Sequence, residues 1–294
     1  MKLRHARTHA HKKASHRRNI SGSRYGRAVP NATYIAYEGR GHAGPPFLLV
    51  HGFPLDRSMW RGQIDGLAPY ARVVALDLPG FGASAPALDG ARAFTMDAMA
   101  EHVIAVADAL GFDRFILGGL SMGGYVAFAL LRKHRARVLG LALLDTRAEA
   151  DAAEMKRARL EDAERVLAEG TSFYVDKMMP RLLAARTVAE RPDLRNGLEL
   201  MLRRATPAGV ASGLRGLADR RDVRAELAKI DVPALVAVGT DDVVTPPEGA
   251  RAMAQAIPGA LLAVIPNAGH MAPFEQPEAT NVALRKLIRK VNAA

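Results

Sequence analysis

The sequence predicts an α/β fold in which a mostly parallel sheet carries helices on both faces. Short apolar runs of strand length alternate along the chain with helical patterns, an order typical of parallel sheets. With 294 residues, 49% of them hydrophobic, the chain can bury one large core or a core with a small second domain. One long interval between strands has helical patterns of its own, which predicts an inserted unit.

The expected strands are apolar runs bounded by Gly, Pro or polar residues. They lie near residues 32–38, 46–51, 72–77, 114–119, 137–144, 233–239 and 260–266. Helical patterns fall between them, near residues 57–68, 95–110, 122–134, 247–257 and 277–291. This alternation predicts parallel neighbours in the sheet.

The interval between residues 144 and 233 is far longer than the ~12–15 residues that a loop without structure tolerates. Four stretches within it have helical patterns. They are residues 149–169, 172–185, 193–204 and 207–218. We therefore expect a helical unit with its own packing between the strand near residues 137–144 and the strand near residues 233–239.

A serine between two glycines follows the apolar strand that ends near residue 119. The five residues are Gly119-Leu120-Ser121-Met122-Gly123, and an apolar helix pattern begins directly after them. A side chain at the tip of a sharp strand-to-helix turn crowds its neighbours, so the residues two before and two after must lack a Cβ. The segment therefore has the local chemistry of a nucleophile elbow with Ser121 at its tip.

A serine hydroxyl needs a base to take its proton and a third group to orient that base. Asp242 follows the strand near residues 233–239, and His270 follows the strand near residues 260–266. Open parallel sheets collect ligand-binding groups at the carboxyl ends of their strands, so Ser121, Asp242 and His270 could meet there. The order Ser, Asp, His along the chain is that of one particular fold.

Five segments in this order closely resemble the α/β-hydrolase family, in its branch of small serine esterases, lactonases and cofactor-free haloperoxidases. The segments are His51-Gly52-Phe53-Pro54, Asp77 to Ser84, the Ser121 turn, Gly239 to Pro246 and Gly269 to Glu278. The resemblance covers roughly residues 30–293. It implies an eight-stranded sheet with a helical cap inserted after strand 6.

The resemblance also implies a division of the chain and a second component of the site. Residues 30–146 and 221–294 would form the hydrolase core, and residues 147–220 the cap that closes over the serine. On matching positions, the backbone N–H groups of Phe53 and Met122 would form the oxyanion hole. No metal and no organic cofactor would be required.

Three other polar residues compete for roles in the site. Asp241 neighbours Asp242, but the family spacing of Gly, Asp and Pro selects Asp242 and leaves Asp241 as a loop or capping residue. Asp145 ends the strand near residues 137–144, a place from which some relatives draw their acid. His51 is expected to shape the oxyanion turn through hydrogen bonds rather than to act as a base.

The inserted helices should set the choice of substrate, because the cap supplies the wall opposite the serine. Apolar residues at helical spacing also pack between cap and core, so pocket lining and plain packing both stay open for them. The candidates for the wall are Phe173, Tyr174, Met178, Met179 and Met201.

These features predict a serine-dependent carboxylic ester hydrolase of the esterase or lactonase type, acting on a small-molecule ester or lactone. The alternatives on the same three residues are a hydrolase of carbon–carbon bonds and a perhydrolase. Met271 stands where ring-fission hydrolases typically carry a tryptophan, which disfavours the first. A small-ligand receptor of the same fold, without turnover, is the alternative from another class.

Composition limits the remaining possibilities. The absence of Cys excludes disulfides, thiolate metal sites and a cysteine nucleophile. No run approaches the ~18 apolar residues of a membrane span, so we expect a soluble, cytoplasmic protein. Abundant arginine and alanine indicate GC-rich coding and a bacterial source. Oligomeric state cannot be read from the sequence.

The net charge of +11 is concentrated at the N-terminus. Nine of the 41 basic residues fall within residues 1–27, which hold no acidic residue, so the other 32 nearly balance the 30 acidic residues. With almost no large apolar side chain, residues 1–29 are expected to form a disordered tail. An incidental extension, an arm for anionic surfaces and an organelle presequence all fit it, and no specific nucleic-acid partner is expected.

Overall fold

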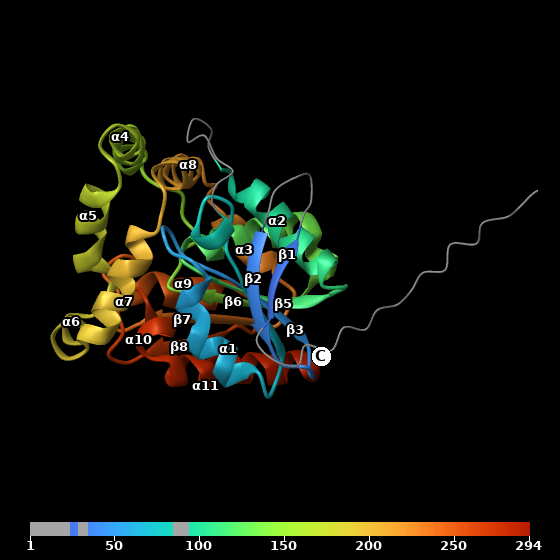
Figure 1. Cartoon of the computed structure of the whole chain (residues 1–294). Helices are drawn as coiled ribbons and strands as arrows, with labels where there is room; N and C mark the ends of the chain where they lie inside the picture. The colour runs from blue at the N-terminus through green and yellow to red at the C-terminus, as the bar shows by residue number, and fades with distance from the viewer. Residues whose placement is uncertain (1–23, 29–34, 85–93) are drawn as a thin grey trace, which may run out of the picture.

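An eight-stranded sheet runs through the centre of the molecule (Figure 1), in the order β1-β2-β4-β3-β5-β6-β7-β8. The structure, a computed structural model, describes residues 24–28, 35–84 and 94–294. The strands are β1 (Arg24–Ala28), β2 (Ile35–Arg40), β3 (Pro46–Val50), β4 (Arg72–Leu76), β5 (Phe115–Leu120), β6 (Val138–Leu144), β7 (Ala234–Gly239) and β8 (Leu261–Ile265). β2 is antiparallel to β1 and β4, and the other pairs are parallel. This confirms the predicted mostly parallel sheet.

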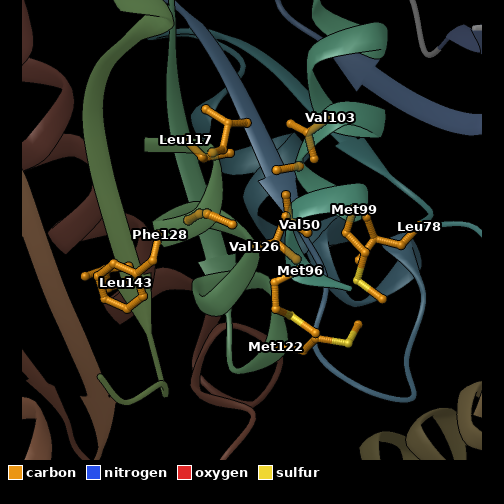
Figure 2. Close-up of a cluster of buried hydrophobic side chains, with 14 of the residues drawn as sticks. Val50, Leu78, Met96, Met99, Val103, Leu117, Met122, Val126, Phe128 and Leu143 are labelled. Carbon is orange, nitrogen blue, oxygen red and sulfur yellow. The ribbon is translucent and has the colours of Figure 1, made fainter. Parts of the chain in front are cut away.

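Alternate residues of the central strands face two separate layers of helices. In β3, Leu48 and Val50 join one buried cluster, whereas Phe47 and Leu49 join the other. The two-residue period of a strand sends neighbouring side chains to opposite faces, and both faces here are apolar because both are covered. Figure 2 shows part of the first cluster, where Met122 lies among side chains from the sheet and from neighbouring helices.

Helices cover the two faces as the alternating pattern predicts. The helices outside the insertion are α1 (Arg61–Leu67), α2 (Met96–Ala109), α3 (Met122–His134), α9 (Pro247–Ala256), α10 (Ala272–Glu275) and α11 (Pro277–Asn292). α2, α3 and α9 contribute to the first cluster, and α1 and α11 to the second. α2 begins where predicted because the Thr95 hydroxyl accepts the Ala98 N–H and so caps its first turn.

The long interval between β6 and β7 is helical, as expected. Its helices are α4 (Ala153–Glu169), α5 (Ser172–Leu182), α6 (Ala185–Glu190), α7 (Pro192–Arg203) and α8 (Pro207–Ala218). In Figure 1 they lie together at the top and left, and α4 packs along α8. The expected helix over 172–185 ends at Leu182 instead, because Leu183 is extended and α6 starts after it. α6 is too short for a periodic pattern to reveal it.

β1 corrects the expectation for the N-terminal segment. Residues 1–29 were expected to lack structure, but Arg24–Ala28 pairs with β2 at the edge of the sheet. An edge strand needs only backbone hydrogen bonds on one side, so a segment poor in large apolar residues can still form one. Residues 1–23, which hold most of the basic tail, lie outside the described residues.

Candidate functional site

Ser121 occupies the turn between β5 and α3. Leu120 ends the strand and Met122 begins the helix, so Ser121 alone makes the connection. Its φ of 51° and ψ of −110° are angles that a non-glycine residue adopts only when its surroundings impose them. Two bonds to the end of β6 do so: the Ser121 N–H donates to Leu144 O at 2.9 Å, and the Ser121 carbonyl accepts from the Thr146 hydroxyl at 2.8 Å. The partly buried Ser121 is thereby held at the carboxyl end of β5.

The flanking glycines are required by contacts that a side chain would destroy. A Cβ at Gly119 would lie 2.2 Å from the carbonyl carbon and oxygen of Gly123. A Cβ at Gly123 would lie 2.2 Å from the carbonyl oxygen of Val50 in β3. Both distances are far below van der Waals contact, and the obstructing atoms are backbone. The turn therefore has the close packing that the sequence pattern predicts.

Asp242 and His270 meet at the same edge of the sheet. They follow β7 and β8, and His270 Nδ1 lies 2.9 Å from Asp242 Oδ2, with both side chains buried. Asp242 Oδ1 accepts the N–H groups of Val244 and Thr245, each at 2.8 Å. The Thr245 hydroxyl donates to Asp242 Oδ2 at 2.5 Å. The Asp242 carboxylate is thus held by donors of its own loop as well as by His270.

The state of this pair follows from its hydrogen bonds. Burial alone would raise the pKa of Asp242, but the facing His270 and the hydrogen bonds from His270 and Thr245 outweigh it and hold that pKa below its usual value. An ionised carboxylate only accepts, so the proton of a neutral His270 belongs on Nδ1. His270 Nε2 then carries the lone pair, and His270 can accept a proton there.

The competing carboxylates lie elsewhere. Asp241 is exposed, and its N–H donates to Ala268 O at 2.8 Å. Asp145 is completely buried at the end of β6, where its Oδ1 accepts the Gly239 N–H at 2.8 Å. Burial, and then the charge of Asp242, raise the pKa of Asp145 well above its usual value. Of these three acids, Asp242 is the one hydrogen-bonded to His270.

Two backbone donors remain available beside the Ser121 turn. In the described part of the chain, the N–H groups of Phe53 and Met122 donate to no protein acceptor. His51 stabilises the turn that carries Phe53: its Nε2 accepts the Leu78 N–H at 3.0 Å and its Nδ1 donates to Gly52 O at 2.8 Å. Burial lowers the pKa of His51, which keeps the ring neutral. Both ring nitrogens of His51 are therefore occupied by hydrogen bonds to the backbone.

The apolar candidates from the insertion have different surroundings. Tyr174 is buried against Phe53, with ring centroids 5.9 Å apart in an edge-to-face arrangement. The Phe173 ring instead carries the Arg165 guanidinium 4.0 Å from its centroid. Met178, Met179 and Met201 pack into or against the core clusters. Among the five, Tyr174 is the residue that contacts the turn carrying Phe53 by an aromatic pair.

Three residues close to this site were missed in the sequence. The Thr146 hydroxyl supports the Ser121 turn, the Thr245 hydroxyl supports Asp242, and the Glu275 carboxylate accepts the Gly269 N–H next to His270 at 2.7 Å. Thr245 and Glu275 both lie inside segments that carry the family resemblance. A polar side chain among apolar neighbours was the available signal for Glu275, in the run Met271-Ala-Pro-Phe-Glu275.

The described residues contain neither a cluster of potential metal ligands nor a membrane-spanning helix. No group of three or more His, Cys, Asp or Glu side chains within them is placed to hold a metal ion. None of their helices combines the length and apolar character needed to cross a membrane.

The chain is similar to known proteins in both sequence and structure. A model of the alpha/beta hydrolase fold family matches residues 45–277. A solved thermophilic esterase from Thermogutta terrifontis, determined with malate bound, is 43% identical, has a TM-score of 0.86, and the match covers 91% of this chain and 99% of that one. 3-oxoadipate enol-lactonase 1 of Acinetobacter baylyi is 30% identical over 80% of this chain and 85% of its own length.

A further relative is longer than this chain. The dihydrolipoyllysine-residue acetyltransferase component of the acetoin cleaving system of Pseudomonas putida is 33% identical over 86% of this chain. The chain spans 66% of that protein. The similarity therefore concerns one part of the longer relative.

Proposed function

Because the chain belongs to the α/β-hydrolase fold family, we propose that it is a serine hydrolase that cleaves a small carboxylic ester or lactone through an acyl-enzyme intermediate. The observation that carries the proposal is the buried 2.9 Å hydrogen bond between Asp242 and His270, at the sheet edge where Ser121 is held in its strained turn. Relatives named as an esterase and an enol-lactonase support the substrate class.

In the first half of the reaction, Ser121 Oγ attacks the carbonyl carbon and passes its proton to His270 Nε2. Asp242 keeps the His270 Nδ1 proton in place and stabilises the imidazolium that forms. The imidazolium then gives the Nε2 proton to the departing alkoxide, and the carbon–oxygen bond breaks. An ester releases its alcohol, whereas the opened alcohol of a lactone stays attached to the acyl group on Ser121.

In the second half, water attacks the acyl carbon while His270 Nε2 again takes the proton, and the Ser121 oxygen leaves with that proton. The N–H groups of Phe53 and Met122 stabilise the oxyanion in both halves. Their lack of an acceptor in the described part of the chain supports this role. Donors of this kind are worth about 3 kcal/mol each to the transition state.

Residues 147–220 are proposed to act as a cap on a core formed by residues 30–146 and 221–294. The helices of this segment contact the turn that carries the proposed oxyanion donor: Tyr174 pairs with Phe53, and a Cβ on Gly213 of α8 would lie 2.6 Å from the Phe53 ring. The nearby surfaces are aromatic and buried, which favours uncharged groups next to the ester.

Intact-mass measurement after treatment with a fluorophosphonate tests the proposal, combined with hydrolysis of a short-chain and a medium-chain p-nitrophenyl ester. We expect a single adduct and turnover in the wild type, and neither in Ser121→Ala. A wild-type protein that forms no adduct and turns over neither ester would overturn the proposal and favour a binding protein of the same fold. The ratio of the two ester rates measures the size of the acyl site.

A further inference from the structure

Glu275 is a buried carboxylate that the proposed reaction does not use. It ends the short helix α10, and only 3% of its surface is exposed. Its Oε1 accepts the Gly269 N–H at 2.7 Å, and its Oε2 accepts the Ala184 N–H at 2.9 Å. The Thr187 hydroxyl and the Met271 backbone lie near enough to this carboxylate to lower its pKa. A buried acid with this many donors is held in one position.

These donors come from two segments that are distant in the sequence. Gly269 and Met271 flank His270 on both sides, whereas Ala184 and Thr187 belong to the insertion, at the extended link before α6 and in α6 itself. In Figure 1, α6 and α7 lie beside α10 at the left of the molecule. One carboxylate therefore joins the backbone on either side of His270 to the inserted helices.

Gly269 is also enclosed by the same inserted segment. A Cβ at Gly269 would lie 2.6 Å from Ala184 N and 2.7 Å from the carbonyl carbon of Leu183. On the other side, a Cβ at Gly239, the last residue of β7, would lie 2.3 Å from Gly269 O. The residue before His270 is thus packed closely between the insertion and the end of β7.

Burial opposes the ionisation of Glu275, and the hydrogen-bond donors around it favour ionisation. Burial raises the pKa of Glu275, while the hydrogen bonds from Thr187 and from the Ala184, Gly269 and Met271 backbones lower it in part. Asp145 is close enough for Glu275 to raise its pKa in turn. An apolar side chain would fill the same space without the cost of burying an ionisable group. We therefore expect the carboxylate to hold its hydrogen-bond donors in position.

We propose that Glu275 is a positioning residue that fixes His270 by joining the two backbone segments beside it to the inserted residues 182–187. This inference rests on the proposed function. The consequence is that the inserted helices contribute to the chemical step as well as to the substrate wall. A shift of the 182–187 segment would move Gly269 with it and would displace the His270 ring relative to Ser121.

The substitution Glu275→Gln tests this directly, because it keeps the shape of the side chain. The glutamine amide nitrogen cannot accept a hydrogen bond, so it would oppose either the Gly269 N–H or the Ala184 N–H. A displacement of about 1 Å in a catalytic group can cost about 100-fold in rate, and we expect kcat to fall by about 10- to 100-fold with KM little changed. The rate of fluorophosphonate labelling should fall with kcat.

Thr187→Val is a milder second variant that removes one donor and leaves the carboxylate. We expect a fall of about 3- to 10-fold in kcat and in the labelling rate, the size of one lost hydrogen bond. Asp151→Asn is the matched control. It removes another buried carboxylate of the insertion, one that pairs with Arg159 and Arg220 and, within the described residues, forms no hydrogen bond or ion pair with the His270 loop. It should lower Tm and leave kcat and labelling near wild type.

The measurements are kcat and KM for a p-nitrophenyl ester, the second-order rate of fluorophosphonate labelling, and Tm, for the full chain and each variant. A kcat-specific fall in Glu275→Gln and Thr187→Val, but not in Asp151→Asn, supports the inference. Wild-type labelling rates in Thr187→Val and in folded Glu275→Gln, or a change confined to KM, would overturn it and leave the proposed function intact. A wild-type protein that is not labelled overturns both.

Discussion

Adding one methyl group at residue 123 tests whether the turn around Ser121 depends on close backbone packing. In Gly123→Ala, the new Cβ would lie 2.2 Å from Val50 O and 3.0 Å from His51 O. An ordinary carbon–oxygen contact needs about 3.3 Å, so the helix start and β3 would have to separate by about 1 Å. Val50 pairs with Leu76 of β4 and with Gly119 of β5, so β3 cannot move without loss of sheet pairing.

The substitution should lower both the stability of the fold and the rate of fluorophosphonate labelling. Overpacking of this kind costs about 2–3 kcal/mol of unfolding free energy, which corresponds to a fall in Tm of about 3–5 °C for a chain of this length. Because the start of α3 must move to relieve the contact, Ser121 and the Met122 N–H move with it, and a displacement of about 1 Å costs about 100-fold in the labelling rate. Both effects should occur together, because the same contact fixes fold and site.

Gly249→Ala is the matched control. Gly249 is an exposed residue of α9, and a Cβ there would meet no atom within 4 Å. Alanine has the higher helix propensity by about 1 kcal/mol, so Tm should rise by about 1–2 °C with labelling unchanged. Thermal unfolding and fluorophosphonate labelling of both variants are the assays. Wild-type Tm and labelling rate in Gly123→Ala would refute the reasoning, because they would mean that the turn has space for a side chain.

Three further predictions concern buried polar groups. Asp242→Asn should lower kcat by about 10⁴-fold with little change in KM, because the amide no longer orients the His270 proton; steady-state kinetics would contradict this if KM alone changed. Because the pKa of Asp242 is depressed in the folded state, its stabilisation is present above its unfolded pKa of about 3.9 and is lost as pH falls through the folded value. The stability difference between wild type and Asp242→Asn in urea should therefore shrink on acidification, and a constant difference would contradict the assignment. Ser84→Ala should cost about 1–3 kcal/mol in urea unfolding, because the hydroxyl accepts the Ala36 N–H and donates to Asp77 O, and an unchanged midpoint would show these bonds to be dispensable.

The sequence was sufficient for strands β2 to β8 and for their order along the chain. Apolar runs such as residues 46–51 and 233–239 correspond to β3 and β7 within one or two residues, because strands covered on both faces need uninterrupted apolar side chains. It was insufficient for β1 and for α6. β1 forms through backbone pairing with β2, and α6 is shorter than the period that would identify it.

For the site, the sequence by itself determined which residues could take part. The glycines around Ser121 and the polar residues after β7 and β8 are local signals. A sharp turn requires glycines beside it, and ligand-binding groups of a parallel sheet follow the carboxyl ends of its strands. Only the tertiary structure decided which groups meet. It placed Asp242 against His270, directed Asp145 to Gly239 N–H instead, and joined Glu275 to Ala184 across 91 residues of chain. Such contacts depend on the register of strands and on how helices pack, and no single segment encodes either.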